Sequence, residues 1–205
     1  MSLKKLHYLS GITITLFVGV HLFNHLYSLF GIDAHIGLMN SLRIVYRNIL
    51  VETILLVAVA IQITSGLKLF KTKRNYAKDF IYKLQIYSGL YLAAFLVIHV
   101  GAVMTGRFIL DLDTNFFFGV AGINTFPFNL FFIPYYGLGV ISFFGHIAAI
   151  HAMKMKTTIA GVSPKEQSYF ILTLGIILSF LIIYGLTNGF QGIEIPEAYH
   201  ILIGK

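Results

Sequence analysis

The stretch Leu6-His-Tyr-Leu-Ser-Gly-Ile-Thr-Ile-Thr-Leu-Phe-Val-Gly-Val-His21-Leu-Phe-Asn-His25 decides how this chain folds. It is apolar and long enough to cross a membrane as a helix, yet it holds two histidines one helical turn apart. Its skeleton returns at a constant offset of 78 positions, pairing Leu6, Ser10, Gly11, Phe17 and His21 with Leu84, Ser88, Gly89, Phe95 and His99. A membrane helix that repeats itself with a histidine at the same place suggests a paired ligand set.

The composition is that of an integral membrane protein. Of the 205 residues, 57% are hydrophobic and only 11% are charged, whereas a soluble domain carries about 25% charged residues. The absence of cysteine excludes disulfides, thiolate chemistry and iron–sulfur ligation by this chain. In a membrane protein, basic residues mark the cytoplasmic side, so the net charge of +7 does not indicate a nucleic-acid partner.

Five segments are long and apolar enough to span a bilayer, which takes ~20 residues each. We place them at residues 5–30, 49–70, 83–106, 131–155 and 168–188. No linker divides the chain, so residues 1–205 form a single all-α domain, a five-helix transmembrane bundle. Residues 31–48 form a link of mixed apolar and polar residues. The aromatic-rich link 107–130 lies at the outer face as a lid, and the tail from Ile193 to Ile203 is a candidate short interfacial helix.

The charges predict the orientation. Eleven of the fifteen Lys and Arg residues lie on the side of the N-terminus, and six of the eight Asp and Glu residues lie on the opposite side. The positive-inside rule then predicts a cytoplasmic N-terminus and an outer C-terminus. We expect a multi-pass protein of the cell's inner (cytoplasmic) membrane.

Two histidines are predicted to lie at one depth. His21 is nine residues before Phe30, and His99 is eight residues before Arg107. At ~1.5 Å per residue they lie ~13 Å and ~12 Å below the outer ends of two helices that both run outward. Haem iron that transfers electrons is commonly held by imidazole from two sides, so His21 and His99 are predicted to be the two axial ligands of a haem.

The next level has only one histidine. His146 lies ~18 Å below the outer face, and Gln62 on the second predicted helix lies ~20 Å below it. An isolated intramembrane histidine is more often a packing or pathway residue than a metal ligand, so a second haem at His146 stays open. Glutamine is a poor iron ligand, and Gln62 is instead a candidate hydrogen-bond partner of His146 or of a quinone.

The remaining polar residues have two interpretations each. His25 contacts a haem propionate or belongs to a polar network. Arg43, Arg47 and Arg107 contact propionates or pair with Asp111 and Asp113. The glycines of the repeat, with their neighbouring serines, allow either a flat ring or another helix to approach. Four histidines are expected outside the ligand set. His7 and His151 are expected at the membrane interfaces, and His35 and His200 in solvated loops.

The order of these motifs resembles a known family. The pattern Lys5-Leu-His-Tyr-Leu-Ser-Gly…His21-Leu-Phe-Asn-His25, Val51-Glu52, Leu84-Gln85-x-x-Ser-Gly…His99-Val and Leu138-Gly…Gly145-His146, followed by Val162-Ser-Pro-Lys-Glu-Gln, resembles the cytochrome b membrane anchors of succinate:quinone oxidoreductases. That family includes the succinate dehydrogenases and fumarate reductases. The resemblance covers residues 4–188 in helix order and spacing, and this chain would be a divergent member of the five-helix type.

The resemblance implies a haem-carrying anchor that docks flavoprotein and iron–sulfur subunits on the cytoplasmic side and exchanges electrons with membrane quinone. His21 and His99 fall where the ligands of the outer haem are expected, and His146 falls where one ligand of an inner haem is expected. Its partner should come from the second helix, where Gln62 stands instead. We therefore expect one haem b per chain, with two as the alternative.

The sequence also bears on functions other than a haem-carrying anchor. The chain holds no flavin-binding glycine motif or carboxylate-substrate site, so it is not a catalytic subunit but an electron-transfer subunit. A haem-free or stand-alone membrane anchor or interaction protein of the same fold is the main alternative. A transporter or proton pathway through Glu52, Gln62 and His146 is disfavoured, because prolines that would break spanning helices occur only at 127, 134, 164 and 196.

Overall fold

The computed structural model describes residues 2–76 and 79–205. Five helices in it are long and apolar enough to cross a membrane: α1 (Leu3–Leu26), α3 (Ile49–Lys73), α4 (Phe80–Phe108), α6 (Asn129–Lys154) and α7 (Pro164–Leu186). A 3₁₀ turn, η1 (Tyr27–Phe30), extends α1, and a second, η2 (Arg74–Tyr76), extends α3. The chain is therefore an all-α, multi-pass membrane protein, and the five predicted spans are confirmed in number and order.

Several helices begin at residues that cap their first turn. The Asp79 carboxylate accepts a hydrogen bond from the Tyr82 amide at 2.9 Å. Ser163 and Glu166 cap one another's backbone in a reciprocal capping box, with Pro164 at the first helical position. Since caps are polar, the apolar pattern misses them, and α4 and α7 begin before the predicted positions 83 and 168. Pro134 also lies inside α6 rather than at its end.

The predicted link 31–48 is largely a helix, α2 (Ile32–Tyr46). Gly31, at φ +106°, turns the chain from η1 into this helix, a conformation that glycine adopts without steric cost. One face of α2 buries His35 and Met39. The helix is too short and too polar to span a bilayer, and for that reason the residue pattern did not predict it.

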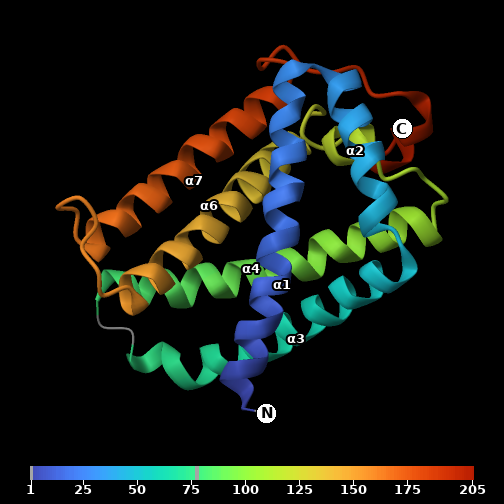
Figure 1. Cartoon of the computed structure of the whole chain (residues 1–205). Helices are drawn as coiled ribbons and strands as arrows, with labels where there is room; N and C mark the ends of the chain where they lie inside the picture. Colours follow the sequence, from blue (N-terminus) through green and yellow to red (C-terminus); the bar gives the residue numbers. More distant parts are fainter. Residues whose placement is uncertain (1, 77–78) are drawn as a thin grey trace.

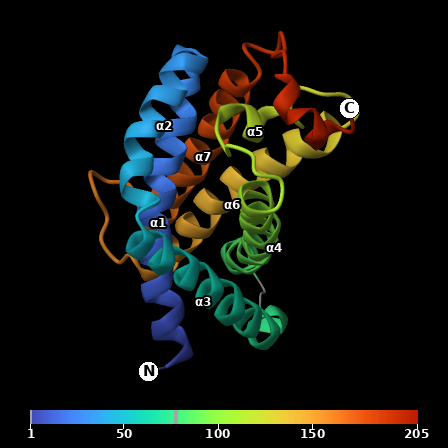
Figure 2. The ribbon, with the colours of Figure 1, turned by 90° about the vertical axis from the view of Figure 1, so that its right-hand side faces the viewer.

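The five long helices form a closed ring. α1 packs against α3 and α7, α3 against α4, α4 against α6, and α6 against α7. α1 and α4, which carry the repeated sequence, approach each other less closely than these pairs do. Figure 1 shows α1 crossing the other helices steeply, and Figure 2 shows α1 and α4 on opposite sides of α6 and α7. The repeat therefore places its two copies across the ring rather than side by side.

The main cluster of buried apolar side chains lies at one end of the ring. It joins the short helix α5 (Phe116–Val120) and the residues after it to the end of α7 and to the tail, which ends in the 3₁₀ helix η3 (Glu197–Ile203). Phe116, Val120 and Ile123 are each at most 2% exposed. The aromatic link thus forms a packed lid, in keeping with the predicted lid, and it closes the end of the bundle near the C-terminus.

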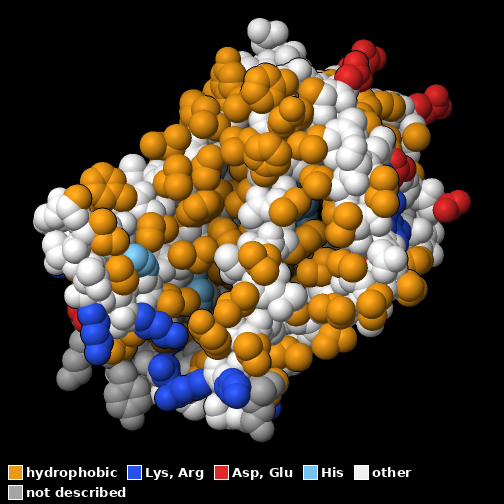
Figure 3. All heavy atoms as spheres, in the orientation of Figure 1, with side chains coloured by type: hydrophobic (Ala, Val, Ile, Leu, Met, Phe, Trp, Pro, Cys, Tyr) orange, Lys and Arg blue, Asp and Glu red, His pale blue; other side chains and the backbone are white. Residues whose placement is uncertain are grey.

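Charges separate along the bundle. On the face shown in Figure 3, Lys and Arg side chains gather at the end near the N-terminus, and most of the acidic side chains gather at the opposite end. Apolar side chains cover the surface between them. This arrangement matches a protein whose middle faces lipid and whose basic end faces the cytoplasm.

The tightest crossing of α6 and α7 yields a test of the packing. A Cβ built on Gly175 would collide with Cβ of Phe144, whereas one built on Gly101 has no atom within 4 Å. We predict that Gly175→Ala lowers the free energy of unfolding by about 1–3 kcal/mol, the cost of overpacking. Gly101→Ala, the matched control, should leave it unchanged or raise it. Unfolding in detergent micelles measures both, and equal stability of the two variants would contradict this packing.

Candidate functional site

The ring of helices encloses polar side chains. The interior residues remain only partly buried, although they lie on helices that surround a common centre: His7, His21, Gln62, His99 and His146. Figure 3 shows histidine side chains at the bottom of a hollow between the helices. Polar groups inside a membrane are costly and usually serve a function, so this interior is the candidate site.

His21 of α1 and His99 of α4 meet in the interior. Their ring centroids lie 6.0 Å apart, and the ring planes are inclined at 65°. Each ring stacks on a phenylalanine one turn earlier: Phe17 lies 5.6 Å from His21, and Phe95 lies 5.2 Å from His99. The same histidine–phenylalanine stack thus occurs in both copies of the repeat. The two histidine rings contact each other, in agreement with the common depth that the spacing predicts.

The spacing of this pair fits a metal held between two imidazoles. Two metal–nitrogen bonds of about 2 Å, with about 1 Å from each nitrogen to its ring centre, give a centroid separation of roughly 6 Å. The donor set fits haem iron, which takes neutral imidazole on both axial sides. α1 and α4 are not among the closely packed helix pairs, so the two rings meet between helices whose backbones stay apart.

His25 competes for the same nitrogen. Its Nε2 lies 3.1 Å from Nε2 of His21, and the two rings meet edge to face. This contact supports the interpretation that His25 belongs to a polar network. Coordination of iron through Nε2 of His21 requires this hydrogen bond to break, which would free the ring of His25 for another partner.

His146 of α6 packs against a serine and a glycine of α4, Ser88 and Gly89, a pair of residues that we call its cradle. Its Nδ1 donates to the backbone carbonyl of Gln85 at 3.0 Å and lies 3.3 Å from Oγ of Ser88. Gly89 makes room for the ring, because a Cβ there would lie 3.0 Å from Cε1 of His146. Metal-binding histidines typically anchor one ring nitrogen on a backbone carbonyl in this way and leave the other for the metal.

Gln62 of α3 sits in the equivalent cradle on α1. Oγ of Ser10 donates to Oε1 of Gln62 at 2.7 Å, and a Cβ on Gly11 would lie 3.4 Å from Nε2 of Gln62. Since Ser10 and Gly11 are the repeat partners of Ser88 and Gly89, Gln62 is the structural counterpart of His146. The predicted equivalence of Gln62 and His146 therefore has a geometric basis.

Of the two candidate partners of Gln62, His146 does not bond to it in the described part of the chain. The amide nitrogen of Gln62 donates instead to Nε2 of His7 at 3.3 Å, and Nδ1 of His7 donates to Oγ of Ser65 at 2.9 Å. Ser10 and His7 on the neighbouring helix α1 thus bond to the oxygen and the nitrogen of the Gln62 amide, which therefore does not extend across the ring to His146. His7, expected at the interface, joins the interior as a result.

The two halves of the repeat carry histidine and glutamine in exchanged positions. The first half has His7 on its first helix and Gln62 on its second, whereas the second half has Gln85 and His146. His7 and Gln85 stand at the same 78-residue offset as the other repeat pairs. A comparison of positions 7 and 85 would have identified His7 as an interior residue from the sequence.

The candidate propionate contacts already have carboxylate partners. The Arg107 guanidinium pairs with Glu52, not with Asp111 or Asp113. Nη2 of Arg43 lies 2.9 Å from the Asp113 carboxylate, as the alternative interpretation predicted. Arg43 and Arg107 can therefore bind a further anion only through guanidinium atoms that Asp113 and Glu52 do not contact.

His35 is not the solvated loop residue that the sequence indicated. It lies on α2, is 2% exposed, and accepts a hydrogen bond at its Nε2 from the Asn24 side chain at 3.3 Å. The ring of Phe116 covers it at 5.0 Å, and that of His25 lies 5.5 Å away. Only the unpredicted helix α2 could bring this residue inside, so the sequence carried no signal for it.

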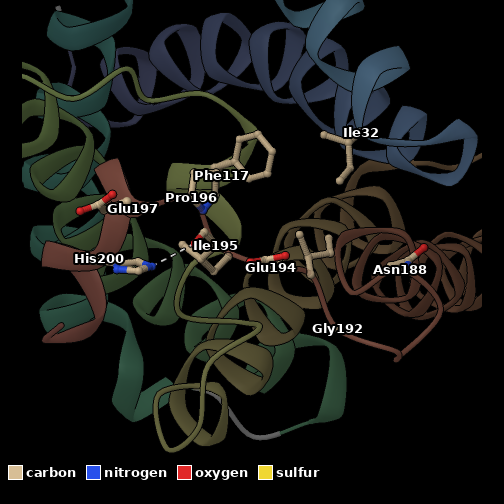
Figure 4. A pocket seen from close by; sticks show the side chains of 10 residues that line it. Ile32, Phe117, Asn188, Gly192, Glu194, Ile195, Pro196, Glu197 and His200 are labelled. Atoms are coloured by element: carbon tan, nitrogen blue, oxygen red, sulfur yellow. Dashed lines mark hydrogen bonds between the residues drawn. The ribbon is translucent and has the colours of Figure 1, made fainter.

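His200 and His151 lie outside this cluster. His200 stands in η3, where its Nε2 donates to the Ile195 carbonyl at 3.0 Å. It lines a pocket of about 630 Å³ at the end of the bundle near the C-terminus, together with Glu194 and Glu197 (Figure 4). His151 donates to Gln167 at 2.8 Å near the other end. Neither residue contacts the interior pair.

Among residues 2–76 and 79–205, no three or more His, Cys, Asp or Glu side chains gather to hold a metal ion. A haem with two axial imidazoles needs only a pair, so this finding does not bear on His21 and His99. Comparisons with protein-family models, with curated proteins and with solved structures give no significant match. The function is therefore argued from the site alone.

Burial of His35 predicts a dependence of stability on pH. Burial, followed by the nearby Arg43 guanidinium, lowers the pKa of His35 to about 4, whereas the unfolded chain has a histidine pKa of about 6.5. As the pH falls below about 6.5, the unfolded state binds a proton that the folded state does not, so stability declines until about pH 4.

Unfolding of the wild type and of His35→Leu between pH 8 and pH 4 measures this effect. The groups that face His35 are Asn24, His25, Phe116 and Arg43. The variant should lose part of the decline in that range. Identical pH profiles for the two proteins would show that His35 does not titrate as its burial requires.

Proposed function

We propose that this chain is the haem b-binding membrane anchor of a complex that resembles succinate dehydrogenase or fumarate reductase. In this role it passes electrons between an iron–sulfur partner and membrane quinone and is not itself the catalytic subunit. The observation that carries the proposal is the meeting of His21 and His99, two halves of a repeated sequence frame, at 6.0 Å inside a ring of membrane-spanning helices.

The side chains around the pair support this role. His21 and His99 are the residues that would hold the iron, and Phe17 and Phe95 fix the planes of their rings by stacking. A haem b bound there would accept and release one electron at a time. Because α1 and α4 are not among the closely packed helix pairs, a flat group bound between the two rings would not have to separate packed backbones.

The inner level supports a quinone contact better than a second haem. Gln62, in the cradle equivalent to that of His146, presents an amide and not an imidazole. One of its N–H groups bonds to His7, and the second is available to a quinone carbonyl oxygen. We therefore assign one haem b to the chain, at His21 and His99, and retain Gln62 and His146 as the candidate quinone contacts.

The charges support a cytoplasmic partner. The basic end of the bundle carries the N-terminus, and the positive-inside rule directs that end to the cytoplasm of a cell's inner membrane. Flavoprotein and iron–sulfur subunits would dock there. Attraction to anionic lipid acts on the same basic residues, so co-purification is needed to establish the partners.

Optical spectra of single variants test the haem assignment. We predict that the purified wild type shows b-type bands in a reduced-minus-oxidised spectrum. His21→Leu and His99→Leu should each lose nearly all of the band intensity, because either change removes one of two axial ligands. His146→Leu, a matched change on another helix of the same interior, should keep most of it.

Circular dichroism and gel filtration would establish that each variant is folded. If haem is supplied during expression and the folded wild type still shows no bands, the chain is a haem-free anchor, and the proposal is wrong. Loss of the bands in His146→Leu together with their retention in His21→Leu would place the haem at another site.

A further inference from the structure

Unpartnered polar atoms gather where α1 meets α2. Asn24 Oδ1, His25 Nδ1, His35 Nδ1 and Arg43 Nε are each buried from solvent and have no hydrogen-bond partner. Asn24 is 5% exposed and His35 is 2% exposed. Buried polar groups are nearly always hydrogen-bonded, and each exception calls for an explanation such as a bound water, ion or ligand. Three of the four atoms are nitrogens that can donate, and they point to a missing hydrogen-bond acceptor.

Most of these atoms are hydrogen-bond donors. Arg43 Nε always carries a proton. The Asn24 amide donates to Nε2 of His35, so the proton of the neutral His35 ring is on Nδ1, which can therefore donate. Either nitrogen of a neutral imidazole can carry its proton, so His25 Nδ1 can donate whether or not its Nε2 contacts His21. Asn24 acts here as a positioning residue, since it sets the tautomer of His35.

The surroundings contain several positive charges. In the described part of the chain, the guanidiniums of Arg43 and Arg47 both contact Asp113, and that of Arg107 pairs with Glu52. Burial, followed by the charges of Arg43 and Arg107, lowers the pKa of Arg47. Arg43 and Arg47 therefore share one carboxylate, and the buried Nε of Arg43 keeps an N–H group for a further anion.

We propose that His25, His35 and Arg43, positioned by Asn24, bind one carboxylate group in a buried site at the junction of α1 and α2. A carboxylate accepts several N–H donors at once and forms short, strong hydrogen bonds with charged ones. Two sources supply this chemistry. One is a propionate of a haem held by His21 and His99, which rests on the proposed function, and the other is a free carboxylate.

Thermal unfolding of the full chain in detergent tests the site. The chain is purified both from cells supplied with haem and from cells starved of haem, and melting is followed against sodium acetate. Acetamide, the neutral isostere of acetate, and sodium chloride at the same ionic strength are the controls. We expect a saturating rise in the melting temperature of the haem-free chain with acetate alone.

The variants separate the site from general effects of salt. Arg43→Met and His35→Leu should abolish the rise, whereas His35→Gln, which retains an N–H donor, should restore part of it. His200→Leu, a matched loss of a half-buried histidine in η3, should leave the rise unchanged. If His35→Leu fails to fold, Arg43→Met still decides the result, because its side chain reaches the surface at 12% exposure.

The two preparations identify the source of the carboxylate. An acetate effect in the haem-free chain alone means that a propionate fills the site in the haem-carrying chain, and an effect in both means that the site takes a free carboxylate. No difference between acetate and acetamide in the haem-free chain would overturn the proposal. A chain that never carries haem contradicts the proposed function, but its response to acetate still decides whether this site exists.

Discussion

The structure depends on the close contact of a long polar side chain with a neighbouring helix across a serine and a glycine. Ser10 and Gly11 receive Gln62, and Ser88 and Gly89 receive His146. In a membrane each such polar group needs a partner, and the absence of a Cβ lets the partner helix approach closely enough to supply it. These contacts join α1 to α3 and α4 to α6. The two pairs then face each other across the ring, where His21 and His99 meet.

The exchange of histidine and glutamine between the halves determines what the interior can do. Both halves keep the cradle, and both keep the histidine–phenylalanine stack further along the helix. Only the stacks bring two imidazole rings to 6.0 Å from each other. At the cradles His7 and His146 also lie in the interior, but both nitrogens of His7 are engaged by Gln62 and Ser65. At the cradles, the amide of Gln62 is bonded to Ser10 and His7 and stands where a second imidazole would be needed. One level of the interior therefore suits a metal between two rings, and the other suits a hydrogen-bonded ligand.

Periodicity and the repeat predicted most of this arrangement. The lengths of the apolar segments predict the five spans. The repeat predicts one depth for His21 and His99, because the number of residues along a helix fixes the distance along its axis. Features that depend on tertiary contacts could not be predicted in the same way. The helix α2 is too polar to be recognised as a span, so the burial of His35 was missed. The Gln62 amide is bonded within its own helix pair, a choice between two nearby partners that spacing alone does not decide.

The ratio of haem to polypeptide tests the account most directly. Pyridine haemochrome absorbance measures the haem, and quantitative amino-acid analysis measures the chain, in protein purified from cells with ample haem. One pair of facing imidazoles predicts one haem per chain. A ratio of two would mean that the level of Gln62 and His146 also binds haem, and a ratio of zero would mean that the meeting of His21 and His99 serves only packing. Either result would contradict the account given for the interior of the ring.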